Sequence, residues 1–117
     1  MSITRIANKA ARRMVELRRP FEGSHLFARE NVPPHQHTTL YVVYSYGPHF
    51  PIYIAETDNE TGHTEWYENN ERYSQSTTRH QQQADPYKPC VPMTSGAMRR
   101  IAAEGIAGFV AKGELNG

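Results

Sequence analysis

The sequence predicts an α+β domain in which a small antiparallel β-meander is flanked by N- and C-terminal amphipathic helices. Apolar residues recur at helical spacing in residues 1–19 and again in residues 95–112. Between them lie segments rich in β-branched and aromatic residues, separated by glycine, proline and asparagine, which form turns. The 117 residues fit one domain. We expect a basic helix at 1–19, the sheet at 24–68, a polar, proline-rich loop region at 69–92 and a helix at 95–112.

The first segment predicts a helix that Ser2 can cap and Pro20 ends, since proline cannot continue the hydrogen-bond ladder. Its expected buried stripe has spacings of three and four, and comprises Ile3, Ile6, Ala7, Ala10, Met14 and Leu17. Residues 1–19 contain six basic side chains and one acid, a local charge of +5. This surface is either a solvated helix face or one that meets phosphates or an acidic protein.

Four segments predict strands, at 24–29, 38–46, 50–55 and 64–68. The second is the strongest, and we expect it to be a central strand because both of its faces are apolar. Leu40, Val42, Tyr44 and Tyr46 would share one face, and Tyr41, Val43 and Ser45 the other. The third segment would pair with it in antiparallel fashion, with Pro51 near its start. Tyrosines on such strands most often pack against the sheet, with an aromatic binding face as the alternative.

The remainder of the chain predicts less regular structure before the last helix. Residues 76–83 form a short helix or turn, with Ser76 as a plausible cap, and residues 85–92 hold three prolines and are irregular. Thr94 or Ser95 can cap the last helix, which Gly105 and Gly108 weaken. Its expected stripe is Met98, Ile101, Ala102, Ile106, Phe109 and Val110.

Composition and charge exclude several classes of protein. No apolar run approaches the ~20 residues that cross a bilayer, so we expect no membrane-spanning segment, and the N-terminus lacks the apolar stretch of a signal peptide. The single Cys90 excludes an intrachain disulfide and a cysteine zinc cluster, which favours a reducing, cytosolic location. The net charge of +1 combines the basic first segment with residues 56–71, which hold six acids and no lysine or arginine.

Residues 66–81 are the densest unusual stretch, with aromatic, hydroxyl, arginine and histidine side chains together. Hydroxyls at a helix start can present N–H groups to an anion, and Tyr73 and Trp66 could stack on a base. Alternatively, the hydroxyls cap a helix and Trp66 fills the core. The candidate binding residues for anions are Arg5, Lys9, Arg12, Arg13, Arg72, Tyr73, Thr77, Thr78, Arg79 and His80. Those for a basic partner are Glu60, Glu65 and Glu68.

Catalytic and metal chemistry have weaker support. Tyr73, Arg79 and His80 match the side chains that metal-independent ribonucleases use, but no spacing rule makes the match specific. His35 and His37, with distant His49 and His80, lack a cysteine or acidic partner, so we expect no metal and no cofactor. Cys90 has no adjacent base, and Ser45 lacks the nucleophile-elbow motif of serine hydrolases. We therefore assign no catalytic residue.

Three stretches resemble a small domain of uncharacterised function that bacteriophages and plasmids encode. They are Tyr41-Val42-Val43-Tyr44-Ser45-Tyr46-Gly47-Pro48-His49-Phe50-Pro51-Ile52-Tyr53, Trp66-Tyr67-Glu68-Asn69, and Tyr73-Ser74 with Thr77-Thr78-Arg79-His80-Gln81. The resemblance covers roughly residues 40–86. It implies a mobile-element protein in a bacterial cytoplasm and implies no activity.

The sequence thus predicts a non-enzymatic phage or mobile-element accessory protein that binds a host or phage macromolecule. Inhibition of a host defence complex is one version, in which the acidic stretch occupies a site built for phosphates. The alternative is a DNA- or RNA-binding protein that uses the first helix with Arg72, Arg79, Arg99 and Arg100. A small nuclease built around His80 is the least favoured alternative. We expect no membrane partner, and an exposed amphipathic helix could close a homodimer.

Overall fold

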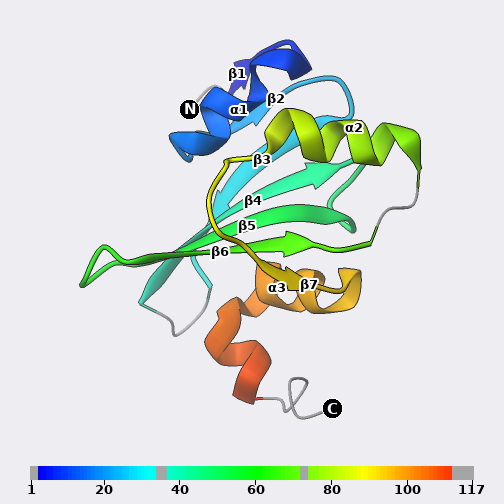
Figure 1. The fold of residues 1–117 in the computed structure, drawn as a ribbon. Helices are drawn as coiled ribbons and strands as arrows, with labels where there is room; N and C mark the ends of the chain where they lie inside the picture. Colours follow the sequence, from blue (N-terminus) through cyan, green and yellow to red (C-terminus); the bar gives the residue numbers. More distant parts are fainter. Residues whose placement is uncertain (1–2, 34–36, 72–73, 112–117) are drawn as a thin grey trace.

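The computed structural model describes residues 3–33, 37–71 and 74–111, which form one sheet with helices on both of its faces (Figure 1). In chain order, the elements are β1 (Thr4–Arg5), the 3₁₀ helix η1 (Asn8–Ala10), α1 (Ala11–Glu16), β2 (Phe21–Glu22), β3 (Leu26–Asn31), β4 (Thr38–Ser45), β5 (Pro51–Asp58), β6 (Thr64–Asn69), α2 (Gln75–Ala84), β7 (Val91–Met93) and α3 (Ser95–Ala111).

The seven strands of the sheet follow one another in space in the order of the chain, β1 to β7. Strands β2 to β6 form an antiparallel meander, but β1 pairs with β2 and β7 with β6 in parallel. The sheet is therefore mixed, and the prediction of a purely antiparallel meander is wrong. Parallel neighbours need a crossover connection, which α1 supplies at one edge and α2 at the other.

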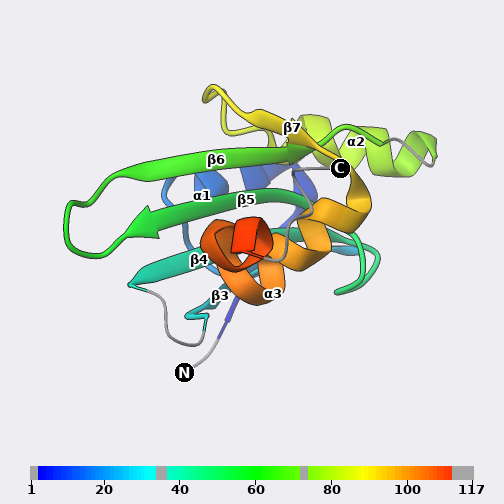
Figure 2. The same cartoon turned by 90° about the horizontal axis from the view of Figure 1, so that it is seen from below.

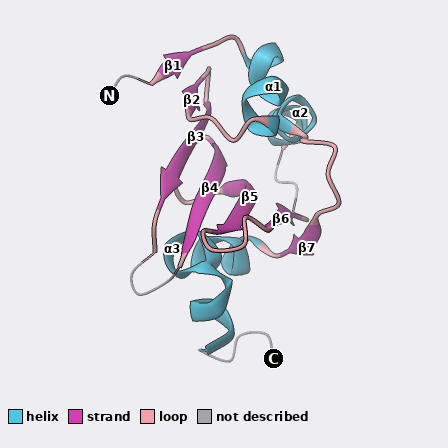
Figure 3. Ribbon diagram, turned by 90° about the vertical axis from the view of Figure 1, so that its left-hand side faces the viewer, coloured by secondary structure: helices cyan, strands magenta, loops and turns pink. Residues whose placement is uncertain are grey.

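Helices α1 and α2 cover one face of the sheet and α3 the other (Figures 2 and 3). The alternation predicted along β4 is confirmed from Leu40 to Val43: Tyr41 and Val43 belong to the core beneath α1 and α2, and Leu40 and Val42 to the core beneath α3. It is wrong for Tyr46, which follows the end of β4 and contacts His80 of α2 instead. The central position predicted for this strand and its antiparallel pairing with β5 are also confirmed.

The prediction of one helix over 1–19 is wrong. Residues 4–5 are a strand, and the α-helix proper runs only from Ala11 to Glu16. Its buried residues are Ala11 and Val15, whereas Leu17 of the expected stripe is 48% exposed. Pairing with β2 replaces the helix: the Ile6 amide donates to the Glu22 carbonyl oxygen at 3.0 Å. The proposed cap, Ser2, lies outside the described residues.

The region predicted as polar, proline-rich loop at 69–92 contains α2 and the start of β7, so residues 76–83, predicted as a short helix or turn, belong to a helix. Ser74, rather than Ser76, caps α2, since its Oγ accepts a hydrogen bond from the Thr77 amide at 3.1 Å. Thr77, His80, Gln81 and Ala84 form the buried face of α2. The helix was difficult to predict because it offers only one buried apolar side chain, Ala84.

Helix α3 is two helical segments joined at Gly105, whose φ of 75° and ψ of 169° interrupt the helix. Thr94 Oγ1 accepts a hydrogen bond from the Ala97 amide at 3.2 Å, which confirms the predicted cap. The buried Glu56 accepts a hydrogen bond from the Ile106 amide at 2.9 Å, where the second segment starts. Phe109 and Val110 lie outside the residues whose side chains the structure describes. No helix of the described residues is long and apolar enough to span a membrane.

Candidate functional site

The candidate site is a cavity of 260 Å³ at one end of the sheet. Strand β4 ends there, and the chain that leaves β6 enters α2 there (Figure 1). The turn between β4 and β5 and the first turn of α2 supply its lining, which comprises Ser45, Tyr46, His49, Phe50, Ser74 and Thr77. Topology thus brings together side chains from separate parts of the chain.

A buried hydrogen bond behind this cavity joins Ser45 to His80. Ser45 Oγ lies 2.7 Å from Nδ1 of His80, and the two residues are 0% and 6% exposed. Burial lowers the pKa of His80, and the positive charges of His25 and Arg79 lower it further. The imidazole is therefore neutral near pH 7 and ties α2 to the end of β4.

Three aromatic rings contact one another beside the cavity. The Tyr46 ring stacks on His25 with centroids 4.9 Å apart and lies 5.3 Å from the His80 ring. Tyr46 and His25 both have positive φ, at 67° and 56°, and the Tyr46 amide donates to the His25 carbonyl oxygen at 2.8 Å. The left-handed region costs a non-glycine residue about 1 kcal/mol or more. Tyr46 nevertheless remains 52% exposed.

Besides Tyr46, the lining comprises the apolar ring of Phe50, the imidazole of His49 and the hydroxyls of Ser45, Ser74 and Thr77. Ser74 Oγ donates to Thr77 Oγ1 at 3.1 Å. The His49 ring folds back over Gly47, where a Cβ would lie 3.0 Å from His49 Cε1, so this position favours glycine. None of the described residues that line the cavity is acidic.

The arrangement suits binding better than nucleophilic chemistry. Ser45 lines the cavity and is hydrogen-bonded to a histidine, as a serine nucleophile would be, but no carboxylate among the described residues hydrogen-bonds to His80 to orient its ring. Burial, with the negative charges of Glu68 and Asp85, raises the pKa of the Cys90 thiol to about 12, which makes it a poor nucleophile. Among the described residues, no group of three or more His, Cys, Asp or Glu could hold a metal. His35 lies outside them.

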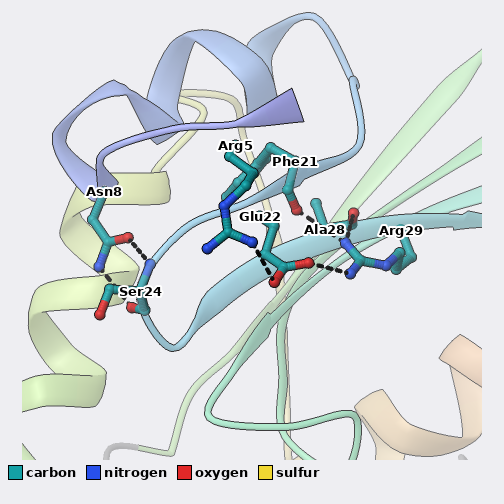
Figure 4. A network of polar contacts seen from close by, with 7 residues as sticks. All are labelled: Arg5, Asn8, Phe21, Glu22, Ser24, Ala28 and Arg29. Carbon is teal, nitrogen blue, oxygen red and sulfur yellow. Dashed lines mark hydrogen bonds and ion pairs between the residues drawn. The ribbon is translucent and has the colours of Figure 1, made fainter. Parts of the chain in front are cut away.

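Two of the predicted basic residues have structural roles. Arg5 pairs with Glu22 at 3.4 Å, and Arg29 pairs with the same carboxylate at 3.2 Å (Figure 4). The Arg12 guanidinium donates to the carbonyl oxygens of Gln82 and Asp85 at 2.8 and 3.0 Å and lies over the Tyr87 ring. It therefore joins α1 to the end of α2.

Three other predicted cations, Lys9, Arg13 and Arg79, are exposed. None forms an ion pair or side-chain hydrogen bond with another residue in the described part of the chain. Lys9 lies in η1, Arg13 in α1 and Arg79 in α2, and these helices pack against one another (Figure 3). Folding thus unites cations that are about 65 residues apart in the sequence on one helical layer.

The other predicted residues of this region differ in their surroundings. Thr77 is buried in the lining of the cavity, and Thr78 Oγ1 donates to the Ser74 carbonyl oxygen at 3.1 Å. Arg72 and Tyr73 lie outside the described residues.

The predicted acidic residues lie along the β5–β6 hairpin. Glu60 is exposed near its tip, Glu65 pairs with His63 at 2.9 Å, and Glu68 is half-buried. The tip lies at the end of β5 and the cavity at its start (Figure 1). The eight residues of β5 separate them by about 25 Å. Glu56 and Glu71 stabilise α3, because they accept hydrogen bonds from the Ile106 and Ser95 amides.

The residues predicted to bind a partner do not include His25, Tyr46 or His49. His25 and Tyr46 are predicted in strands, although Gly23-Ser24 precedes His25 and Gly47-Pro48 follows Tyr46, and both pairs are typical of turns. Those turns could have placed both rings at one end of a meander. No sequence pattern predicts that they stack.

A larger open cleft of 530 Å³ lies beside β1 and β3. Its charged lining includes Arg19, Arg29 and Glu30, and the Arg29 guanidinium is held by Glu22 and two backbone carbonyl oxygens (Figure 4). It gathers no stacked rings, so the smaller cavity remains the better candidate.

No protein-family model, curated protein or solved structure matches the chain.

Proposed function

We propose that this protein is a non-enzymatic binding module for a macromolecule of a phage or its host, and that this macromolecule is a nucleic acid. The observation that carries the proposal is the position of Lys9, Arg13 and Arg79, three exposed cations on helices that pack together. The aromatic cavity lies at the start of α2, the helix that carries Arg79.

A polyphosphate fits this surface for an electrostatic reason. Exposed lysine and arginine side chains that form no ion pair with a carboxylate can neutralise phosphate groups. This neutralisation releases the counterions that are condensed on a nucleic acid. Arg5 and Arg12 are occupied within the fold, so three of the predicted cations, Lys9, Arg13 and Arg79, remain as candidate contacts on this helical layer. Three contacts to a single strand give a slope of about −2 when the logarithm of affinity is plotted against that of salt concentration.

Charge reversal tests the proposal. Lys9→Glu with Arg13→Glu would weaken binding of a labelled 15-nucleotide single strand by at least tenfold at low salt. The comparison variant is Arg100→Glu: the sequence also predicted Arg100 as a nucleic-acid contact, but this exposed residue lies in α3, the helix on the opposite face of the sheet (Figure 2). The control would bind nearly as the unmodified protein does. Equal loss in both variants, or no binding at low salt, would contradict the proposal.

The second candidate is a protein partner, such as a host defence complex that the protein inhibits. The observation that favours it is the β5–β6 hairpin, which extends beyond the sheet and carries exposed Glu60 and Glu65 (Figure 1). A partner captured from bacterial lysate would be lost on Glu60→Lys and retained on Glu16→Lys, an exposed acid on α1. Retention of the partner by both variants would contradict this version.

We also propose that the protein belongs to a phage or another mobile element and acts in the bacterial cytoplasm. The homodimer is a further prediction, which light scattering after size-exclusion chromatography would detect.

The least favoured alternative is a nuclease. RNA cleavage in EDTA that is lost on His80→Ala would support a nuclease in place of the binding module.

A further inference from the structure

We propose that the 260 Å³ cavity receives one unstacked base of a single-stranded nucleic acid. This inference rests on the proposed function and adds the form of the ligand. It concerns the end of the sheet where Tyr46, His49 and Phe50 meet the first turn of α2.

The size and lining of the cavity favour a single ring system. Pockets for complete drug-sized ligands measure about 300–1,000 Å³, and this one measures 260 Å³. Phe50 is an apolar wall of the cavity, and the half-exposed ring of Tyr46 offers aromatic surface to the face of a base. Thr77 Oγ1 accepts from Ser74, and its own proton has no acceptor among the described residues, so it can donate to the edge of a base.

The stacked rings next to the cavity supply a second, independent observation. Tyr46 and His25 both have left-handed backbones and stack on each other, although both residues remain exposed. Burial of apolar surface therefore does not explain this arrangement, and backbone strain of this kind clusters at ligand sites. Bases of single strands stack on exposed aromatic side chains, whereas in a duplex their faces are already covered.

Charge selects an anionic ligand over a cationic one. None of the described residues that line the cavity is acidic, and His80 behind it is held neutral by burial. Arg79 lies close enough to lower the pKa of His80, whereas Arg99 donates to the His49 carbonyl oxygen at 3.3 Å and interacts with the charge of Glu71. A phosphate next to the bound base would be attracted to the Arg79 guanidinium.

The test compares a labelled 15-nucleotide oligo-dT strand with a 15-base-pair duplex by fluorescence anisotropy at low salt. We expect the single strand to bind at least tenfold more tightly. Tyr46→Ala would reduce single-strand affinity about tenfold and leave duplex affinity unchanged. The matched control is Tyr87→Ala, because Tyr87 is also exposed, at 69%, and has a φ of 54°. This control would retain the preference for the single strand.

The other outcomes of these binding measurements would overturn the base site alone or the base site together with the nucleic-acid proposal. Equal affinity for strand and duplex, or equal effects of the two tyrosine variants, would overturn the base site and leave the nucleic-acid proposal standing. Absence of binding to both probes would overturn both. If Tyr46→Ala does not fold, NMR titration of the unmodified protein with oligo-dT replaces it. Shifts at the His25 and His49 ring protons support the site, and shifts confined to η1 and α1 overturn it.

Discussion

Nδ1 of His80 lies 2.7 Å from the hydroxyl oxygen of Ser45, which links the inner face of α2 to the last residue of β4. Both residues are buried, so the bond is largely shielded from solvent. The His80 ring also supports Tyr46, the aromatic wall of the cavity. This buried contact thus helps to position α2, together with the hydrogen bonds of Gln81 to Tyr53 and Asn69, and it places the ring that faces the proposed ligand.

We predict that Ser45 and His80 are energetically coupled. Each of Ser45→Ala and His80→Ala leaves a buried polar partner unpaired and would lower the free energy of unfolding by about 1–3 kcal/mol. The double variant would lose less than the sum, because neither partner is then left alone. Urea denaturation of the four proteins measures this, and strictly additive losses would show that the bond contributes nothing.

Stability should fall in mild acid because of His80. Its pKa in the folded protein lies below the ordinary imidazole value, so the unfolded chain binds more protons in this range. The contribution is complete above about pH 6.5 and declines as the pH falls through that value toward the lower folded pKa. Urea unfolding at a series of pH values would show this decline, and His80→Gln would make the curve flatter. An unchanged curve would contradict it.

Substitution of Arg12 should lower the stability of the protein, whereas substitution of the neighbouring Arg13 should weaken oligonucleotide binding. Arg12→Ala removes two hydrogen bonds to backbone carbonyl oxygens and the contact with Tyr87, and would lower the free energy of unfolding by about 1–2 kcal/mol. Arg13→Ala would change stability by less than about 0.5 kcal/mol and weaken oligonucleotide binding instead. Thermal unfolding measures the stability of the two variants, and fluorescence anisotropy measures their oligonucleotide binding. A loss of stability in Arg13→Ala together with weaker binding in Arg12→Ala would contradict the structure.

Gly105→Ala should destabilise the protein by about 1–3 kcal/mol. The φ of 75° and ψ of 169° are essentially restricted to glycine, and an added Cβ would lie 3.1 Å from Glu56 Oε2. The matched control is Gly96→Ala in the same element, where the nearest atom would be 3.9 Å away. We expect the control to be neutral or slightly stabilising. Equal effects of the two variants in urea denaturation would contradict this account of the kink.

The sequence predicted those parts of the fold in which side-chain pattern decides the structure. Alternation from Leu40 to Val43 identified a central strand with two buried faces, and the spacing of Met98 and Ile101 identified the helix beneath it. The first segment was misassigned because its helical spacing is overridden by pairing between β1 and β2. Two-residue strands leave no periodic signal. The helix around His80 was only partly recognised because its inner face is mostly polar.

The site was predicted less well, because it depends on contacts between distant turns. Arg79, His80 and Thr77 stood out through their chemistry. Neither His25 nor Tyr46 could be assigned, since their stacking requires the β2–β3 and β4–β5 turns to lie side by side. Arg12 was indistinguishable from Arg13 in the sequence, and only the position of the end of α2 shows which of them is occupied.

The salt dependence of oligonucleotide binding tests the central claim most directly. The affinity of a labelled 15-nucleotide single strand is measured between about 20 and 200 mM salt for the unmodified protein and for Lys9→Glu with Arg13→Glu. We predict a log–log slope of about −2 that becomes about −0.7 in the variant, as two of three phosphate contacts are lost. A slope near zero, or the same slope in both proteins, would contradict a nucleic-acid surface on this helical layer.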